Sequence, residues 1–240
     1  MTYSRAERLA RTAMLLPQEG LDRLWNAHVM VFGLGGVGSY AAEALCRAGV
    51  GRLTLVDADV VAVSNCNRQL PALCSTVGRA KTEVVRERLL DIAPDAHVQA
   101  ITAFHLPEAP VPIPEDVAYV VDAIDTVAAK LDIAATCHGR GIPLVACMGM
   151  GNRLDPTKIR IGDLFDTAGC PLCRVMRREL RRREIPALRC VYSVEEAREA
   201  KPCGDSRPGG RPVPGSVAYV PSVAGLYLAY DVVNRLCGGG

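Results

Sequence analysis

The segment 33–38, with the sequence GLGGVG, constrains the fold of this chain more than any other feature. It follows the apolar run 28–32 and precedes a segment, 39–49, with the composition of a helix. Glycines between a strand and a helix let backbone amides approach phosphate oxygens, whose negative charge the helix N-terminus favours. A second apolar strand is expected at 52–59 and ends in acidic residues. This order predicts one half of a doubly wound nucleotide-binding fold.

The same alternation continues after the second strand. Amphipathic helices are expected at 79–92 and 126–138, and apolar strands at 97–103, 117–125 and 143–149. Strands that alternate with helices form parallel sheets with helices on both faces. The sequence therefore predicts an α/β fold with a doubly wound, Rossmann-like and mostly parallel sheet.

The chain is expected to comprise three parts. Residues 1–26 form an N-terminal helical segment, with helices at 4–16 and 18–26. Residues 27–151 form the Rossmann-like domain, and residues 152–240 form a C-terminal extension of the sheet with mixed structure. The nucleotide site is thus expected in the middle part.

The C-terminal extension is expected to contain strands, helices and one loop. Strands are expected at 157–163 and 189–195, a basic helix at 171–183, and a final helix from about residue 222 to residue 236. Residues 202–215 contain four prolines and four glycines, which predicts a mobile loop.

Composition limits the class of protein. The 240 residues are 49% hydrophobic, which suffices for a buried core, yet no apolar run reaches the length of a membrane span. The N-terminus lacks the apolar core of a secretory signal, so a soluble, cytoplasmic protein is expected. The ten cysteines are then mostly small buried thiols rather than a disulfide scaffold.

Charged residues near the glycine turn narrow the choice of nucleotide. Asp57 lies 19 residues after Gly38, where a carboxylate accepts hydrogen bonds from ribose hydroxyls. These features alone leave NAD, FAD and ATP as alternatives. Two cations, Arg68 and Lys81, then follow along the chain. They suit a triphosphate that loses pyrophosphate, because charge builds up on that leaving group.

Two acids, Asp122 and Asp125, end the strand expected at 117–125. Ligands of open α/β sheets bind at the carboxyl ends of the strands, so both side chains are expected near the nucleotide. Magnesium prefers oxygen ligands, and Asp125 is a candidate to hold it.

Five motifs occur in the order GLGGVG, VDADVV, NCNRQ, GRAK and DAIDT, and they resemble the ThiF/MoeB/HesA superfamily, bacterial relatives of ubiquitin-activating enzymes. In the second half, PLCRVMRREL, RCVYSVEE and SVAYVPSVAGLYLA resemble the branch of this superfamily that dehydrates threonylcarbamoyladenosine in tRNA. The resemblance covers nearly the whole chain and is looser at 202–215. It implies an ATP- and magnesium-dependent enzyme that adenylates a carboxylate.

The resemblance also assigns roles to single residues. The glycines would cradle phosphates, Arg68 and Lys81 would polarise them, and Asp125 would ligate magnesium. The full set implied for the nucleotide site is Gly33, Gly35, Gly36, Gly38, Asp57, Asp59, Asn65, Arg68, Gln69, Lys81 and Asp125.

The N-terminal segment is implied to act across a homodimer. Arg8 matches an arginine that reaches the ATP site of the partner subunit in this superfamily, where it would serve as an arginine finger. Arg11, on the same expected helix, is the alternative.

Cys190 lies where the family has a cysteine in a C-V-[FY]-S segment. It is either a nucleophile that accepts the activated acyl or sulfur group, or a buried strand thiol. The buried thiol is favoured, because the reaction can proceed without a cysteine.

Cys170 and Cys173 form one CxxC pair, whereas zinc-bearing members of the superfamily use two. A zinc site could be completed only by Cys203 and Cys237, so two ordinary thiols are favoured.

The expected helix at 171–183 is rich in arginine. Residues 1–150 carry 13 basic and 16 acidic residues, whereas residues 151–240 carry 15 and 10. The helix is either a solvated surface or a phosphate-binding face, and the preference for arginine over lysine favours contact with tRNA. Its arginines are Arg174, Arg177, Arg178, Arg181, Arg182 and Arg183.

The favoured reaction is attack of the threonylcarbamoyladenosine carboxylate on the α-phosphate of ATP, followed by cyclisation of the acyl-adenylate. The main alternative is adenylation of the C-terminus of a ubiquitin-like sulfur carrier, which shares the ATP site. A nicotinamide-dependent oxidoreductase and a catalytically silent tRNA-binding module are further alternatives. A sulfur-transfer protein is a possible partner in the first two cases.

Overall fold

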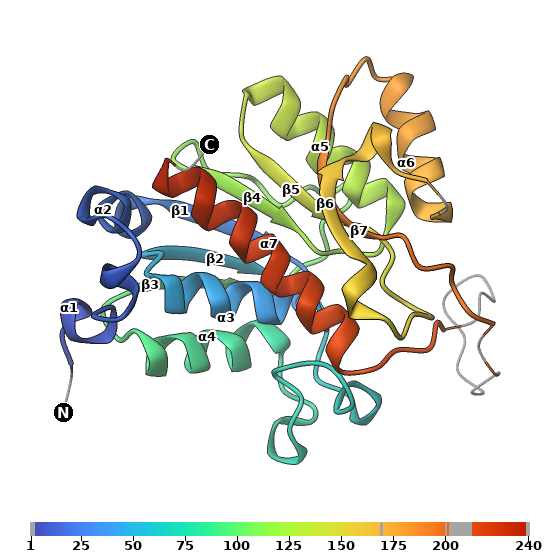
Figure 1. The fold of residues 1–240 in the computed structure, drawn as a ribbon. Coiled ribbons are helices and arrows are strands. Elements are labelled where there is room, and N and C mark those ends of the chain that lie inside the picture. The colour runs from blue at the N-terminus through green and yellow to red at the C-terminus, as the bar shows by residue number, and fades with distance from the viewer. Residues whose placement is uncertain (1–2, 169, 200, 202–212, 239–240) are drawn as a thin grey trace.

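Seven strands form one sheet in the order β3-β2-β1-β4-β5-β7-β6 (Figure 1). The structure is a computed structural model that describes residues 3–168, 170–199, 201 and 213–238. All neighbouring strands are parallel except β6 and β7, which are antiparallel. The strands are β1 (His28–Phe32), β2 (Arg52–Val56), β3 (His97–Ile101), β4 (Tyr119–Asp122), β5 (Leu144–Cys147), β6 (Ile159–Asp163) and β7 (Arg189–Ser193). The α/β, mostly parallel fold expected from the sequence is confirmed.

Helices cover both faces of this sheet, and the alternation within β1 shows how. Val29 and Val31 pack into one cluster with α3 (Gly38–Ala48), α4 (Lys81–Ile92) and α7 (Tyr219–Cys237). Met30 and Phe32 point to the other face, where they meet α5 (Val127–Arg140). Successive strand residues face opposite sides, so a strand covered on both faces must be apolar throughout.

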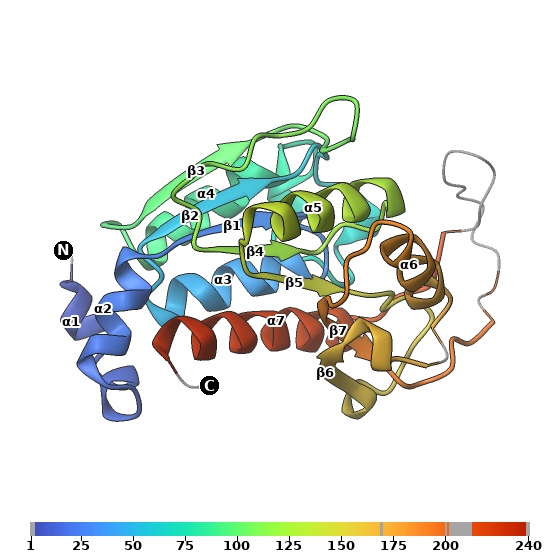
Figure 2. The same ribbon diagram turned by 90° about the horizontal axis from the view of Figure 1, so that it is seen from above.

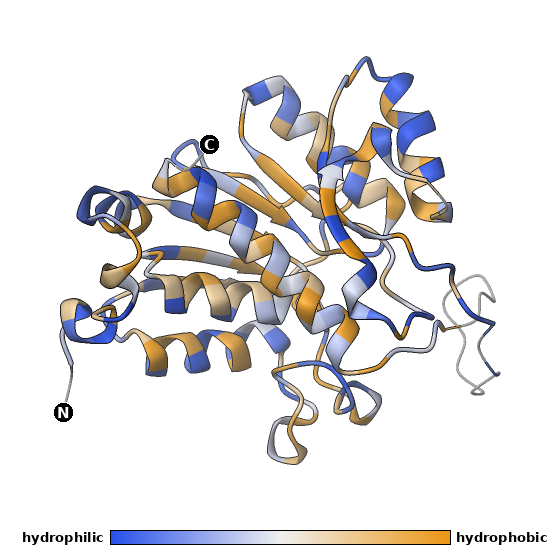
Figure 3. Cartoon of the chain, in the orientation of Figure 1, coloured by the Kyte–Doolittle hydropathy of each residue, from blue (hydrophilic) through white to orange (hydrophobic). Residues whose placement is uncertain are grey.

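A further helix, α6 (Pro171–Arg181), covers the end of the sheet beside α5. Its buried stripe consists of Cys173, Met176 and Leu180, spaced three and four residues apart. This spacing places all three on one side of the helix, and arginines occupy the other side. Figure 3 shows the contrast between the largely hydrophilic residues of α6 and the mostly hydrophobic central strands of the sheet.

Two expectations for the helices need correction. The helix expected at 4–16 is split into α1 (Arg5–Arg8) and a separate 3₁₀ turn at Thr12–Met14. Ser4 and Glu7 form a capping box that starts α1, but Met14 and Leu15 remain 81% and 86% exposed. The final helix starts at Tyr219 rather than near residue 222, because proline is tolerated in a first helical turn.

The start of α7 closes against the glycine turn. A Cβ at Gly225 would lie 2.3 Å from the carbonyl oxygen of Val37, so only glycine allows α7 to approach this closely. The same approach brings Pro221 to within 3.2 Å of the position of a Cβ at Gly36. The C-terminal helix therefore forms one wall beside the first β–α turn.

The strands on either side of the boundary expected at residue 151 belong to the same sheet, since β5 pairs with β7. The loop expected at 202–215 lies outside the described residues except for its last three positions. No helix among the described residues has both the length and the apolar character of a membrane span.

Candidate active site

A cavity of about 620 Å³ opens where the carboxyl ends of β1, β2 and β4 meet. The chain order of the strands reverses beside β1, and ligands of doubly wound sheets bind at such a point. Of the eleven residues implied for the nucleotide site, all but Gly38 line this cavity. Arg68, Lys81 and Asp125 thus face the same space.

The glycines of the turn serve two different purposes. Gly33 has a φ of +88°, and a Cβ there would lie 2.8 Å from the carbonyl oxygen of Ala123. At Gly38 a Cβ would lie 1.8 Å from the carbonyl oxygen of Gly33. Gly38 therefore permits close packing of α3 against the turn, which corrects the expectation that it cradles phosphates. A Cβ at Gly35 would meet only the Gln69 amide nitrogen, at 3.8 Å, and Gly35 lines the cavity.

Asp57 ties the glycine turn to the end of β2. Its Oδ2 accepts a hydrogen bond from the backbone N–H of Leu34 at 2.6 Å, and its Oδ1 accepts one from Asp59 at 2.8 Å. Burial raises the pKa of Asp57, an effect that the nearby Lys81 ammonium and these hydrogen bonds oppose. The carboxylate is thus held rigidly at the cavity wall, where the sequence places the ribose.

Lys81 is a largely buried cation at the start of α4. Its Nζ lies 2.7 Å from Oδ2 of Asp59, while its backbone N–H donates to the Asp59 carbonyl at 3.0 Å. The Lys81 side chain is 5% exposed and that of Asp59 is 56% exposed. A buried ammonium beside a solvated carboxylate can exchange that partner for a bound anion.

Arg68 and its neighbours are held by short-range hydrogen bonds. One guanidinium nitrogen of Arg68 donates to the Ser64 carbonyl at 2.9 Å and to Oδ1 of Asn67 at 2.8 Å. Asn65 accepts from the backbone N–H of Ala62 and so caps a 3₁₀ turn. Gln69 Oε1 is buried and has no hydrogen-bond partner among the described residues. An unsatisfied buried amide at a cavity wall is costly, and a bound ligand can satisfy it.

Asp122 does not belong to the ligand-facing set, contrary to expectation. It is 1% exposed and pairs at 2.9 Å with Lys130, which is 0% exposed. Lys130 also donates to the Ile124 carbonyl at 3.1 Å, and Asp122 accepts from the Ile124 N–H at 3.1 Å. Removal of one partner from a buried pair costs about 3–5 kcal/mol, because an uncompensated charge remains. The pair therefore fixes the loop that carries Asp125.

Sequence reasoning missed Lys130 and several cavity residues. A lysine on the apolar side of the helix expected at 126–138 was the available signal for a buried ion pair. The remaining unpredicted lining comes from the loop after β3, the loop after β5 and the start of α7, and it includes Phe104, His105, Leu106, Met150, Pro214, Ser216 and Pro221. The first two loops follow strands of the same sheet, so their position at its carboxyl edge was foreseeable.

Cys190 lies in β7, between β5 and the edge strand β6, and does not line the cavity. Its side chain is fully buried, and burial raises its pKa to about 12. A thiol in this state is a poor nucleophile, so the geometry favours the buried-thiol interpretation.

The cysteines considered as zinc ligands are not brought together in the described part of the chain. Cys170 and Cys173 lie at the start of α6, whereas Cys237 ends α7 and packs against Gly20 at the other side of the molecule (Figure 1). Cys203 lies outside the described residues. A hydrogen bond from Cys173 lowers the pKa of Cys170, so these two thiols form a pair of their own. No group of three metal-ligating side chains occurs in the described part of the chain.

Arg8 does not line the nucleotide cavity. It forms an ion pair with Asp95 beside a second hollow, which is lined by residues that precede β1 and β2. That hollow is at the amino ends of the strands, so Arg8 cannot reach the nucleotide cavity within one chain.

The helix expected at 171–183 ends at Arg181, so Arg182 and Arg183 directly follow α6. The six arginines in and after this helix divide into an inner and an outer group. Arg177 points inward and donates to the Thr167 carbonyl at 2.7 Å, so it holds the chain before the helix rather than facing solvent. Glu179 accepts hydrogen bonds from Arg178, Arg182 and Arg183 at 3.0–3.1 Å. Five of the six arginines thus remain on the outer surface, three of them oriented by one carboxylate.

Comparisons with known proteins agree with this geometry. A tRNA threonylcarbamoyladenosine dehydratase of Bacillus subtilis (strain 168) is 40% identical over 237 residues, which cover 95% of this chain and 93% of that protein. The crystal structure of the E. coli tRNA N6-threonylcarbamoyladenosine dehydratase in complex with AMP is similar with a TM-score of 0.87 and 32% identity, and it covers 99% of this chain and 98% of that chain. The same E. coli protein in complex with ATP gives a TM-score of 0.85, 33% identity and the same coverage.

The ThiF family model matches residues 8–239. This span includes the glycine turn, every residue that lines the cavity and the arginine helix α6. The chain therefore belongs to the ThiF family.

Proposed function

We propose that this protein uses ATP to dehydrate threonylcarbamoyladenosine in tRNA to its cyclic form. The observation that carries the proposal is the convergence of Arg68, Lys81 and Asp125 on the cavity beside the glycine turn. Relatives that cover nearly the whole chain bear the name of this dehydratase, and one of them binds ATP and AMP in crystals.

The adenylation step follows from the charges in the cavity. A carboxylate oxygen of the substrate attacks the α-phosphorus, the bond to the bridging oxygen breaks, and pyrophosphate leaves with that electron pair. Lys81 and Arg68 stabilise the charge that builds up on the leaving group. Lys81 can turn from Asp59 toward phosphate because both partners lie at the cavity wall. The orphaned amide oxygen of Gln69 accepts a hydrogen bond from the bound nucleotide or its water.

The chemistry of the donor set fits magnesium. Asp125 places carboxylate oxygens in the cavity, and such oxygens together with phosphate oxygens are the ligands that magnesium takes in nucleotide sites. When bound, the ion would neutralise charge on the phosphate oxygens. The Asp122–Lys130 pair keeps Asp125 in place by fixing the backbone at Ile124.

The second step needs no protein nucleophile. A nucleophilic atom of the substrate's own side chain attacks the acyl carbon, and AMP leaves with the oxygen that was activated. The substrate thereby loses the elements of one water molecule. Ring closure is favourable because the nucleophile and the acyl carbon belong to one side chain. Cys190 takes no part in this scheme.

The tRNA is proposed to bind along the outer surface of α6. Glu179 orients three guanidinium groups there without neutralising them all, which presents a positive surface to phosphates. Arg181 stacks on Phe165, with its guanidinium carbon 5.3 Å from the ring centroid. A protein that acts on tRNA is expected in the cytoplasm, and a sulfur-transfer partner stays a prediction.

A homodimer is proposed from the placement of Arg8. Within its own chain this residue is remote from the cavity, so a role in adenylation requires a second subunit. Met14 and Leu15, close to Arg8 along the chain, are exposed apolar side chains of the kind that subunit contacts bury.

The first prediction tests the activity itself. Lys81→Ala is expected to lower the rate of tRNA-dependent AMP formation by about 10²–10³-fold, because one cation is lost from the leaving group. Nucleoside mass spectrometry of the tRNA would show loss of one water in the wild-type reaction and little in the variant. Lys158→Ala, which removes an exposed lysine outside the cavity, is the matched control.

Wild-type protein is also to be incubated with ATP and a diglycine-ended sulfur carrier in place of tRNA. Pyrophosphate exchange with the carrier alone would contradict the proposal and favour the sulfur-carrier adenylyltransferase instead.

The second prediction concerns Cys190. At pH 8 about one Cys190 thiol in ten thousand is ionised, given a pKa of about 12. Iodoacetamide is therefore expected to modify the exposed Cys66 and Cys74 before Cys190, and Cys190→Ala is expected to retain catalytic activity. Peptide mass spectrometry and the AMP assay measure these outcomes. Trapping of a thioester on Cys190 during turnover would show that the scheme is wrong.

The third prediction concerns Arg8. A mixture of Arg8→Ala and Lys81→Ala subunits is expected to recover up to about a quarter of wild-type activity, because half the dimers are mixed and each holds one complete site. Each variant alone is expected to be inactive. If the mixture stays inactive while the subunits exchange, Arg8 does not act across a dimer, and the same test with Arg11→Ala identifies the alternative.

The fourth prediction concerns α6. Arg182→Ala is expected to weaken tRNA binding about equally for all tRNA sequences and to lower the salt slope of binding by about 1. Arg47→Ala removes an exposed, ion-paired arginine on α3 and serves as the control. Filter binding at several salt concentrations measures both slopes. Equal slopes for wild type and Arg182→Ala would remove α6 from the tRNA contact.

A further inference from the structure

A third hollow lies on the outer side of α5, apart from both the nucleotide cavity and the hollow beside Arg8. It is a groove of about 490 Å³ between α5 and α6, two helices that lie side by side in both views (Figures 1 and 2). Val127 and Leu131 of α5 and Val175 of α6 give it an apolar floor. The groove is therefore shaped for a flat apolar surface rather than for an ion.

The groove and the nucleotide cavity share a ridge. Leu106 lines the cavity and the next residue, Pro107, lines the groove. In the same way Thr126 lines the cavity and Val127 lines the groove. The groove and the nucleotide cavity thus lie on opposite sides of one wall. This wall consists of residues 106–107 and 126–127.

The ridge is held in one conformation by a buried histidine. His105 lies 2.9 Å through Nε2 from Oδ2 of Asp132, and its Nδ1 accepts the backbone N–H of Val111 at 3.2 Å. Because Nδ1 is an acceptor, Nε2 carries the proton and donates to Asp132. The ring of His105 also packs edge-on against Phe32 with centroids 5.1 Å apart. A wall fixed from both sides keeps a constant separation between the two hollows.

Two arginine side chains lie at the outer rim of the groove. Arg178 and Arg183 line it, and Glu179 between them accepts hydrogen bonds from both. At this rim two guanidinium groups face one carboxylate, so the α6 side of the groove carries a net positive charge. The second carboxylate of the groove, Asp132, lies on the α5 side, where it pairs with His105. A nucleotide has the complementary form, with an apolar base face and an anionic phosphate.

We propose that this groove is an RNA subsite for the nucleotide next to the modified adenosine. The base of that neighbour lies on the apolar floor and its phosphate faces Arg178 and Arg183, while the side chain of the adenosine reaches over the ridge into the cavity. The inference rests on the proposed function, because it takes a tRNA as the substrate. It adds a place where one neighbouring base is held by apolar contact with aliphatic side chains, which does not depend on the identity of the base.

The test fills the groove from its exposed side. Ala128 is an exposed residue of α5 that lines the groove, and Ala128→Trp puts an indole where the base is proposed to lie. The KM for tRNA is expected to rise about tenfold, because the base loses its apolar contact with the floor of the groove. The affinity for ATP and the thermal midpoint are expected to stay at the wild-type values. Val175→Trp fills the same groove from α6 and gives an independent variant.

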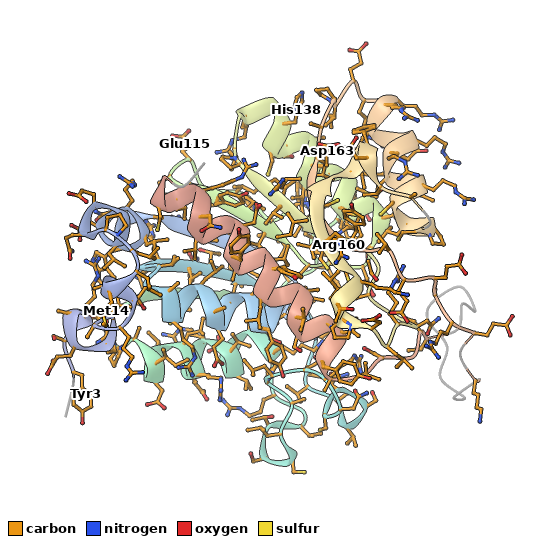
Figure 4. The ribbon with its side chains drawn as sticks, viewed as in Figure 1. Tyr3, Met14, Glu115, His138, Arg160 and Asp163 are labelled. Atoms are coloured by element: carbon orange, nitrogen blue, oxygen red, sulfur yellow. The ribbon has the colours of Figure 1, made fainter. Side chains whose placement is uncertain are left out.

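The matched control is His138→Trp. His138 is an exposed residue near the far end of α5 and does not line the groove (Figure 4). It places the same indole on the same helix, and it is expected to leave the KM for tRNA unchanged. An equal rise in KM for His138→Trp and Ala128→Trp would overturn the subsite.

The RNA supplies the second half of the test. Anticodon stem-loops that contain the modified adenosine are made with an abasic site at the nucleotide before it or after it. For the wild type, one of the two abasic sites is expected to raise the KM about tenfold. For Ala128→Trp the same abasic site is expected to leave the KM unchanged, because the indole already fills the groove. If each abasic site raises the KM of the wild type and of Ala128→Trp by the same factor, the proposal is overturned.

These results separate the subsite from the function on which it rests. If wild type fails to convert threonylcarbamoyladenosine in any tRNA, the proposed function fails and the subsite falls with it. If wild type converts it and both groove variants show the wild-type KM, only the subsite is wrong.

Discussion

The buried pair of Asp122 and Lys130 is the interaction on which the site depends. It joins the end of β4 to α5, and it holds the intervening backbone through the N–H and carbonyl of Ile124. That short loop contributes Asp125 to the nucleotide cavity and then leads into the helix that forms the outer groove. Such a pair contributes little net stability compared with apolar packing, but it allows one arrangement of the loop and not others.

The central fold was predictable because its signals are local. The glycine turn between an apolar run and a helix, repeated alternation and acids at strand ends all lie within short windows of sequence. The cavity residues Arg68, Lys81 and Asp125 were predictable for the same reason, since parallel strands bring their carboxyl ends to one edge. The helix at 4–16 was not, because its division depends on how the segment packs rather than on its own pattern.

Features that depend on contacts between distant segments could not be read from the sequence. Asp122 and Asp125 are three residues apart and both end a strand, yet one is buried against Lys130 and the other lines the cavity. Arg177 looked like its arginine neighbours on α6, but it points inward to Thr167. Gly38 matched the phosphate motif, and only its distance to Gly33 revealed a packing role. In each case the burial of the side chain decides the role, and burial is a property of the whole fold.

The C-terminal helix α7 connects two distant regions of the molecule. At its first turn Pro221 borders the nucleotide cavity, and at its last residue Cys237 packs against Gly20 in α2. A helix of 19 residues spans about 28 Å and transmits a displacement along its axis almost without bending. The helix is thus a rigid connection between the wall of the cavity and the N-terminal segment that carries Arg8. A shift of the cavity wall along the axis of α7 would therefore also move the N-terminal segment against which the end of the helix packs.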